Sequence, residues 1–78
     1  MIVSQFTLYA DTRRGRRPSF TTAAPPRIAE PLVERVVDGF RRAGIEVQSG
    51  RFGARMAVEL ENDGPVTVLV ETRRGRLV

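Results

Sequence analysis

The chain has 78 residues and a formal net charge of +4, enough for one small domain with a basic surface. It contains neither Cys nor His, which excludes disulfides, ordinary zinc sites and catalytic triads built on an imidazole or a thiol. All thirteen basic residues are Arg, whose planar guanidinium suits phosphate, although an Arg-rich proteome would give the same composition. Charge alone therefore leaves nucleic acid open as a partner without deciding for it.

The small size of the chain limits its core. A domain of this length hides only about 60% of the surface that its unfolded chain exposes, so it needs an unusually efficient core or a partner. The first residues lack the basic region of a signal peptide, and no apolar run approaches the length that spans a bilayer. We therefore expect a soluble, cytoplasmic protein that makes no membrane contact.

The first predicted element is a strand over residues 2–9, which is rich in β-branched and aromatic side chains. Alternation favours core positions for Phe6 and Leu8 and a wetter face for Gln5 and Thr7. A second interpretation is that the polar residues of this strand are buried for a purpose, because an unpaired buried polar group costs about 1–3 kcal/mol.

Residues 12–26 form a predicted loop dominated by Arg, Gly, Pro, Ser and Thr. This loop could grip phosphate, with Phe20 as a surface on which a base stacks. The alternative is a solvated basic loop. Its four basic residues are Arg13, Arg14, Arg16 and Arg17.

A helix is predicted from about residue 27 to residue 43, because apolar residues recur at every fourth position. We expect Pro31 in its first turn, where a missing N–H matters least, and Gly44 just past its end. Two Arg residues in the last turn suit the negative end of the helix dipole. The apolar stripe consists of Ile28, Leu32, Val33, Val36, Val37 and Phe40.

Two further strands are predicted after the helix, over residues 54–61 and 66–71. Just before them, Gly50 and Gly53 flank Phe52, which allows close approach of the backbone or marks a bulge. The element order is strand, helix, strand, strand. The predicted fold class is therefore α/β, with an antiparallel hairpin at its end.

The turn between these two strands has the sequence NDGPVT, residues 62–67. Asp-Gly is a strong hairpin signal, but Pro65 cannot donate a ladder hydrogen bond and it restricts Gly64. A cis bond between the two would turn both carbonyls the same way and present them as a rigid pair of acceptors. The sequence alone does not establish this isomer.

One hexapeptide pattern occurs twice, as DTRRGR at residues 11–16 and as ETRRGR at residues 71–76. We interpret the repeat as coincidence rather than duplication in a chain so rich in Arg and Gly. Both copies nevertheless place Arg clusters at the ends of predicted strands. If those ends lie close together, they form one basic rim.

Four motifs in order, SQFTLYAD, RRGRRPSF, GRFGARM and NDGPVT, resemble the D-aminoacyl-tRNA deacylase family. The resemblance runs from residue 3 to about residue 70 and concerns the C-terminal half of such proteins. It implies part of a barrel-like sheet fold. We therefore expect residues 1–78 to form a single, incomplete domain whose N-terminal half is missing.

The resemblance also implies a reaction, the hydrolysis of the ester that joins a D-amino acid to the 3′ end of tRNA. This chiral proofreading is assisted by the 2′-OH of the terminal adenosine and needs no cofactor and no metal. Gly64 and Pro65 would form a Gly-cisPro loop that rejects L-aminoacyl esters, acting across the interface of a homodimer.

The resemblance assigns the remaining site residues as well. Phe52 and Met56 would belong to the pocket of the terminal adenosine, and backbone groups of Phe6 and Thr7 would lie at the scissile ester. Thr7 has no base beside it that would make it a nucleophile. The catalytic pocket wall would consist of Ser4, Gln5, Phe6 and Thr7.

A rival hypothesis from a different class is a non-catalytic RNA-binding or dimerisation remnant that keeps the Arg residues but has lost turnover. It predicts salt-sensitive tRNA binding without ester hydrolysis. In that case the four loop Arg residues matter more than Gly64 and Pro65.

Overall fold

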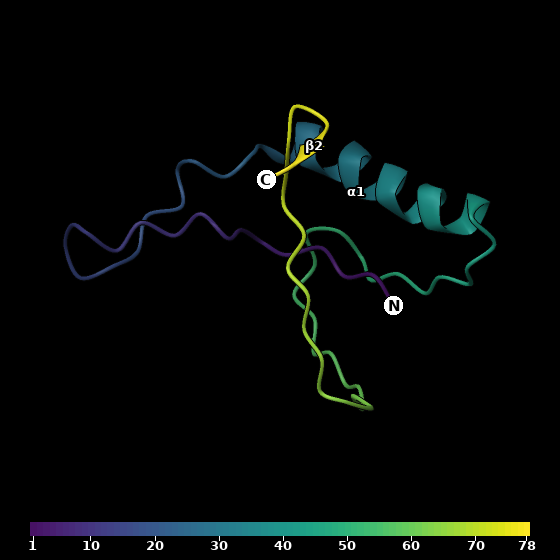
Figure 1. Cartoon of the computed structure of the whole chain (residues 1–78). Coiled ribbons are helices and arrows are strands. Elements are labelled where there is room, and N and C mark those ends of the chain that lie inside the picture. The colour runs from purple at the N-terminus through teal and green to yellow at the C-terminus, as the bar shows by residue number, and fades with distance from the viewer.

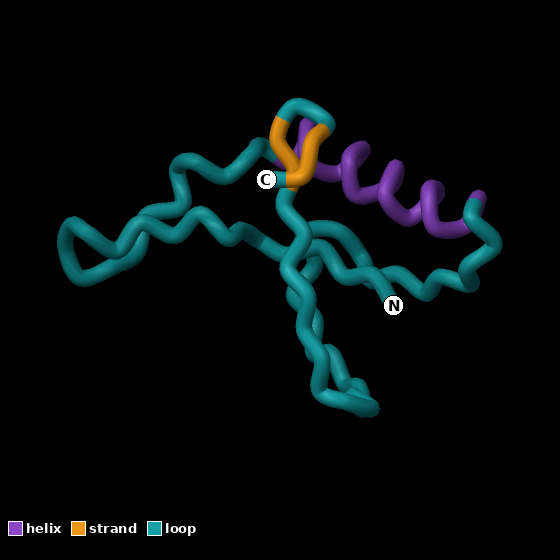
Figure 2. Tube along the Cα trace, in the orientation of Figure 1, coloured by secondary structure: helices purple, strands orange, loops and turns teal.

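The computed structural model describes residues 1–78 and contains one helix and one two-stranded antiparallel sheet. The helix α1 spans Pro26–Arg42, and the strands β1 and β2 span Thr72–Arg73 and Arg76–Leu77 (Figure 1). The remainder of the chain runs as extended segments and loops (Figure 2). The only helix is neither long enough nor apolar enough to cross a membrane.

The predicted helix is confirmed to within one residue at each end, but its first turn differs. The helix begins with Pro26 at its first position, so Pro31 lies inside the helix and not in the first turn as predicted. Proline has no N–H, so the carbonyl of Arg27 loses its partner four residues later. No side chain caps this end, and the first turn contains no acidic residue.

The C-terminal end of α1 confirms the role predicted for Gly44. Its φ is +83°, and its N–H donates to the carbonyl oxygen of Arg41 at 3.0 Å. The N–H of Ile45 donates to the carbonyl oxygen of Phe40 at 3.1 Å. These two bonds form a Schellman motif, which satisfies carbonyls that the helix leaves without partners.

The three predicted strands are not formed as strands, and this part of the prediction is wrong. Residues 2–9 make one isolated parallel bridge, between Ile2 and Ser49, and residues 54–61 and 66–71 share no ladder of hydrogen bonds. A period of two indicates an extended backbone, but a strand also needs a hydrogen-bonded neighbour. The antiparallel hairpin that does form lies further along the chain, at β1 and β2.

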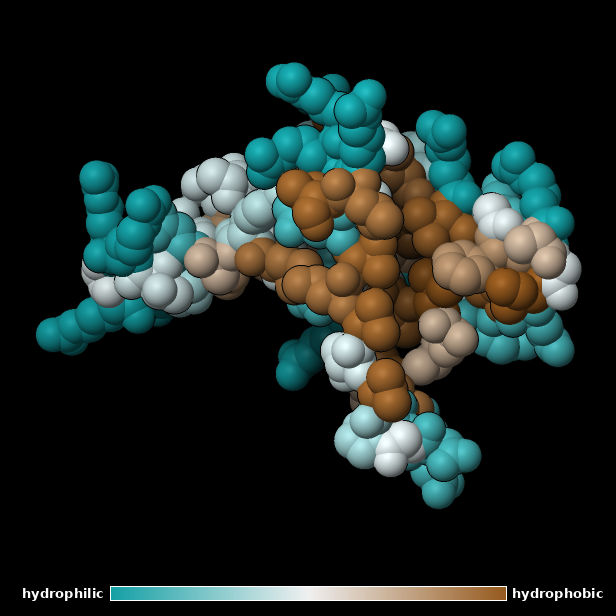
Figure 3. All heavy atoms as spheres, viewed as in Figure 1, coloured by the Kyte–Doolittle hydropathy of each residue, from teal (hydrophilic) through white to brown (hydrophobic).

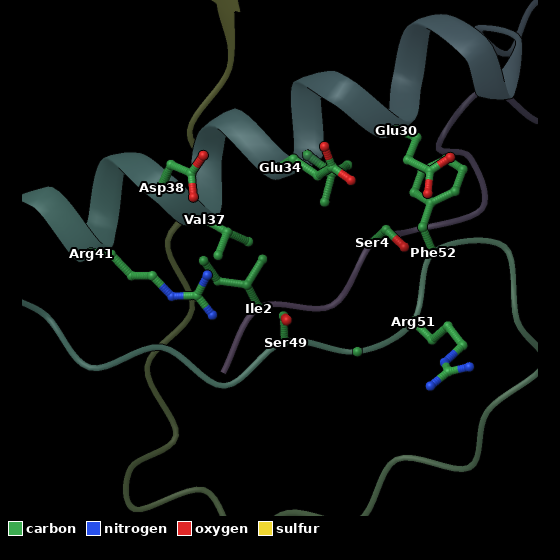
Figure 4. Close-up of a pocket in the computed structure, with 12 residues that line it drawn as sticks. Ile2, Ser4, Glu30, Glu34, Val37, Asp38, Arg41, Ser49, Arg51 and Phe52 are labelled. Atoms are coloured by element: carbon green, nitrogen blue, oxygen red, sulfur yellow. The ribbon is translucent and has the colours of Figure 1, made fainter.

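The small core lies where α1 meets the N-terminal segment. The N–H of Ile2 donates to the carbonyl oxygen of Gln48 at 2.8 Å, and the N–H of Gly50 donates to the carbonyl oxygen of Ile2 at 3.1 Å. Above this bridge Val37 of α1 faces Ile2 (Figure 4). Val37 is the one buried residue, with 6% of its surface exposed. The core is therefore a single contact between a helix and a bridged pair of segments.

Much of the apolar surface lies open to solvent. The chain exposes 8078 Å², whereas a folded monomer of this mass exposes about 4,700 Å². Its radius of gyration is 14.9 Å, against about 11.5 Å for a compact chain of this length. The predicted stripe of α1 is divided, since Val37 is buried while Leu32, Val36 and Phe40 are each about half exposed. Figure 3 shows the resulting continuous apolar surface.

Neighbouring valines of α1 test which face of the helix is covered. We expect Val37→Ala to lower the free energy of unfolding by roughly 1–2 kcal/mol, at about 0.8 kcal/mol for each buried carbon removed. Val36→Ala should be neutral or slightly stabilising, because alanine has the higher helix propensity. Urea unfolding followed by helical circular dichroism measures both. An equal loss of unfolding free energy in Val36→Ala would contradict the exposure of Val36 on the open face of α1.

Candidate functional site

A mostly apolar cavity of about 500 Å³ lies between the N-terminal half of α1, residues 4–6 and residues 52–56. α1 contributes Ala29 and Val33 to its wall. Segments that are far apart in the sequence therefore meet at one hollow. The predicted site residues that line it are Ser4, Gln5, Phe6, Phe52 and Met56.

Three of the residues predicted for the catalytic and substrate pocket lie elsewhere. Thr7 does not line the cavity, and its Oγ1 accepts a hydrogen bond from the N–H of Tyr9 at 2.9 Å. Gly64 and Pro65 are exposed, and the turn of residues 62–67 that contains them lies at the tip of the segment that projects from the body of the molecule (Figure 1). Within one chain, the loop predicted to select chirality therefore does not reach the cavity.

The segment of residues 50–56, which includes one wall of the cavity, is shaped by its glycines. The N–H of Arg51 donates to Sδ of Met56 at 3.4 Å, and a Cβ on Gly50 would lie 3.1 Å from that sulfur. Gly50 thus permits the thioether of Met56 to approach the backbone closely. Gly53 has a φ of +73° and turns the chain after Phe52.

The aromatic pair Phe6 and Phe20 links the basic loop to the cavity. Their ring centroids lie 5.1 Å apart at an interplanar angle of 76°, an edge-to-face contact. Phe6 remains 75% exposed and Leu8 80% exposed, so the prediction that these two residues occupy the core is wrong. No second layer covers this segment, which leaves Phe6 free to form part of a wall.

The basic loop is closed at its base by a pair of backbone hydrogen bonds. The N–H of Asp11 donates to the carbonyl oxygen of Ser19, and the reverse bond is also made, both at 2.8 Å. Arg13 folds back onto Asp11, with Nε on Oδ1 and Nη2 on Oδ2, each at 2.9 Å. The other three Arg residues of the loop make no ion pair.

This bidentate contact shifts the titration of both partners. The Arg13 side chain lowers the pKa of Asp11, and the backbone N–H of Arg13 on Oδ1 lowers it further. The carboxylate in turn raises the pKa of Arg13. Arg13 is therefore held by the protein itself, while its three neighbours are free to meet an external anion.

The turn at residues 62–67 has two features that bear on its predicted role. The Gly64–Pro65 peptide bond is cis, as the resemblance implies. A Cβ added to Gly64 would lie 2.8 Å from the backbone nitrogen of Val66, closer than such atoms approach without movement. Any larger residue at position 64 consequently requires the backbone of this exposed turn to shift.

A second hollow, of about 290 Å³, adjoins the first along α1 (Figure 4). Three carboxylates one helical turn apart line it, from Glu30, Glu34 and Asp38. Sequence reasoning missed this row, although its spacing of four residues was a readable signal. Arg41 and Arg51 line the same hollow, so its charge is mixed. The carboxylates do not form a cluster that could hold a metal ion.

Comparison with known proteins decides the family. The model of the D-Tyr-tRNA(Tyr) deacylase family matches residues 1–71. The chain belongs to this family. The resemblance found in the four motifs is thereby confirmed, and the match concerns the C-terminal half of the relatives.

Curated relatives share high identity with this deacylase-family chain. It is 64% identical over 72 residues to the D-aminoacyl-tRNA deacylase of Roseiflexus sp. (strain RS-1), covering 92% of this chain and 46% of that protein. It is 61% identical over 71 residues to the D-aminoacyl-tRNA deacylase of Kineococcus radiotolerans, covering 91% and 50%. The chain thus spans about half the length of the curated relatives it matches. No solved structure matches it significantly.

The contact between Asp11 and Arg13 can be tested by titration. We expect carboxyl NMR to give Asp11 a pKa below its ordinary value, and Arg13→Gln to raise that pKa toward the ordinary value. Because the folded-state pKa is lowered, the stabilisation is present above the ordinary pKa and is lost as pH falls through the lowered one. Arg14→Gln is the matched control and should leave the Asp11 pKa in place. An equal effect of both variants would contradict the bidentate contact.

Proposed function

We propose that this chain takes part in hydrolysis of the ester bond of D-aminoacyl-tRNA, releasing a D-amino acid and free tRNA. The observation that carries the proposal is the cavity that brings Ser4, Gln5 and Phe6 together with Phe52 and Met56. These residues come from two of the motifs through which the chain resembles deacylases. The size and apolar lining of the cavity suit an aminoacyl group and the terminal base of a tRNA.

The chemistry of such a site must be supplied mainly by the substrate and the backbone. Water adds across the ester and the acyl–oxygen bond breaks. The 3′ oxygen takes one proton of the water, the amino acid leaves as a carboxylate, and the second proton passes to solvent. The chain has no imidazole or thiol to act as base or nucleophile, and the hydroxyl of Thr7 is engaged by Tyr9. The neighbouring 2′-OH of the tRNA would assist the attack, and backbone N–H groups near Phe6 and Thr7 would stabilise the oxyanion.

Chiral selection is assigned to Gly64 and Pro65, acting on the cavity of a second copy of the chain. Two observations support a site completed by a partner. The turn is exposed and lies outside the cavity of its own chain, and apolar residues of α1 are left open. A rigid backbone loop suits this task, because a soft apolar pocket separates similar groups by only about 1–3 kcal/mol.

The second candidate function is a non-catalytic RNA-binding or dimerisation remnant. It is favoured by the single buried residue of the chain, since such a core would hold a catalytic constellation loosely. It is favoured also by the Arg residues, of which only Arg13 forms an ion pair. The two candidates differ in one measurable property, which is turnover.

Turnover is measured as release of amino acid from D-aminoacyl-tRNA by the purified chain, with the L-aminoacyl ester as control. We expect D-selective release whose rate per chain rises with chain concentration, because the active species contains two copies. Salt-sensitive tRNA binding without release of either amino acid would favour the non-catalytic candidate. Equal release of both amino acids would contradict the assigned chiral filter.

The turn at Gly64 offers a sharper test of selectivity. Gly64→Ala places a Cβ against the backbone of Val66, so we expect the loop to shift and the ratio of D- to L-ester hydrolysis to fall roughly tenfold or more. Gly39→Ala is the matched control, because no atom lies within 4 Å of its added Cβ. It should keep the ratio and stabilise α1 by about 0.5–1 kcal/mol. An unchanged ratio in Gly64→Ala would place the filter elsewhere.

A further inference from the structure

The C-terminal hairpin is a feature that the family match leaves unexplained. The match ends at residue 71, whereas β1 and β2 begin at Thr72 and end at Leu77. This hairpin contains the second copy of the repeated pattern, and neither the cavity nor the Gly64–Pro65 turn involves it. Its three Arg residues therefore need an explanation of their own.

The hairpin holds three positive charges in a small space. Arg73 lies directly opposite Arg76 in the antiparallel register, and opposite residues in such a pair have Cβ atoms about 4.5–5.5 Å apart. Between them, Arg74 and Gly75 have φ angles of +53° and +76°, as in a two-residue type I′ turn. Like charges at opposite positions destabilise a hairpin. The turn itself is also unusual, because Arg74 is the one non-glycine residue of the chain with a positive φ.

Nothing within the chain neutralises this cluster. The single ion pair of the structure joins Arg13 to Asp11, so Arg73, Arg74 and Arg76 have no carboxylate partner. Glu71, which precedes β1, uses its backbone carbonyl to accept from Val78 at 3.0 Å, and its side chain pairs with no Arg. All hairpin residues are exposed. The repulsion is thus left for an external anion to relieve.

The two copies of the pattern form the same kind of structure in two places. Each copy is a turn with glycine at positive φ, at Gly15 (+70°) and Gly75 (+76°), and each stands on an antiparallel base. The loop of residues 12–18 lies at the left of Figure 1 and the hairpin at its top, so they do not form the single rim considered from the sequence. Figure 3 shows hydrophilic side chains over both, with apolar surface between them.

We propose that the β1–β2 hairpin binds the phosphate backbone of RNA, at a second site separate from the loop of residues 12–18. The inference rests on the proposed function for its ligand, which is the tRNA part of the substrate. Arg guanidinium groups form bidentate hydrogen bonds with phosphate oxygens, and two separated clusters suit an extended polyanion. Engagement of one cluster raises the effective concentration of phosphate at the other.

The test compares three variants that each remove three positive charges, in binding of unacylated tRNA across a range of salt concentrations. The hairpin variant is Arg73→Gln, Arg74→Gln and Arg76→Gln, and the loop variant replaces Arg14, Arg16 and Arg17. The control replaces Arg35, Arg41 and Arg42 of α1. The slope of log K against log salt changes by about 0.7–0.9 for each phosphate that the protein no longer neutralises. We expect both the hairpin and the loop variants to flatten it by about 2, and more than the control does.

A hairpin variant with the slope of the wild type, or of the control, would overturn the proposal. Binding of the wild type to phosphatidylserine vesicles but not to tRNA would overturn it in favour of a lipid surface. Hydrolysis of D-aminoacyl-adenosine, which lacks the tRNA body, separates failure of the hairpin proposal from failure of the proposed enzymatic function. Turnover of that small substrate by the hairpin variant should equal that of the wild type. If neither the wild type nor the hairpin variant hydrolyses D-aminoacyl-adenosine, the proposed enzyme activity is contradicted. The salt slopes of tRNA binding still test the hairpin site in that case.

Discussion

The contact between one stripe of α1 and the bridged segments at Ile2 and Ser49 is the interaction on which the rest of the structure depends. It buries Val37 and positions residues 4–6 beside residues 52–56, which creates the cavity. The Schellman motif at Gly44 ends the helix and sends the chain back toward Ser49. A helix end, one parallel bridge and one buried valine therefore set the geometry of the whole candidate site.

That contact is too small to account for a stable, independent domain. Relative to a compact monomer the chain exposes roughly 3,300 Å² of additional surface, more than the roughly 800 Å² that each partner buries in an interface of standard size. The exposed stripe of α1 and the exposed wall residue Phe6 both belong to this excess. The Gly64–Pro65 turn also lies away from the cavity. A site completed by a second copy would account for both observations.

Unpaired Arg residues occur over the whole molecule, because only Arg13 forms an ion pair. The hollow beside the cavity combines three carboxylates of α1 with Arg41 and Arg51. The loop of residues 12–18 and the β1–β2 hairpin differ from it, because each holds several Arg residues and no carboxylate. The carboxylate of Asp11 forms a bidentate contact with Arg13, so the Arg13 side chain is not free to bind an external anion. Four loop Arg residues that the sequence does not distinguish thus differ in their availability to a polyanion.

The sequence by itself determined what depends on neighbouring residues: the helix and its end at Gly44, the turn at residues 62–67, and the motifs that identify the family. Through the motifs it also predicted eight candidate residues of the catalytic and substrate pocket, of which five line the cavity: Ser4, Gln5, Phe6, Phe52 and Met56. Only the tertiary structure decided which of them meet, which stripe of α1 is covered, and that residues 2–9 gain no strand partner. Helix formation and capping are satisfied within about one turn of chain, whereas a ladder, a buried face and a cavity require segments far apart in the sequence to meet.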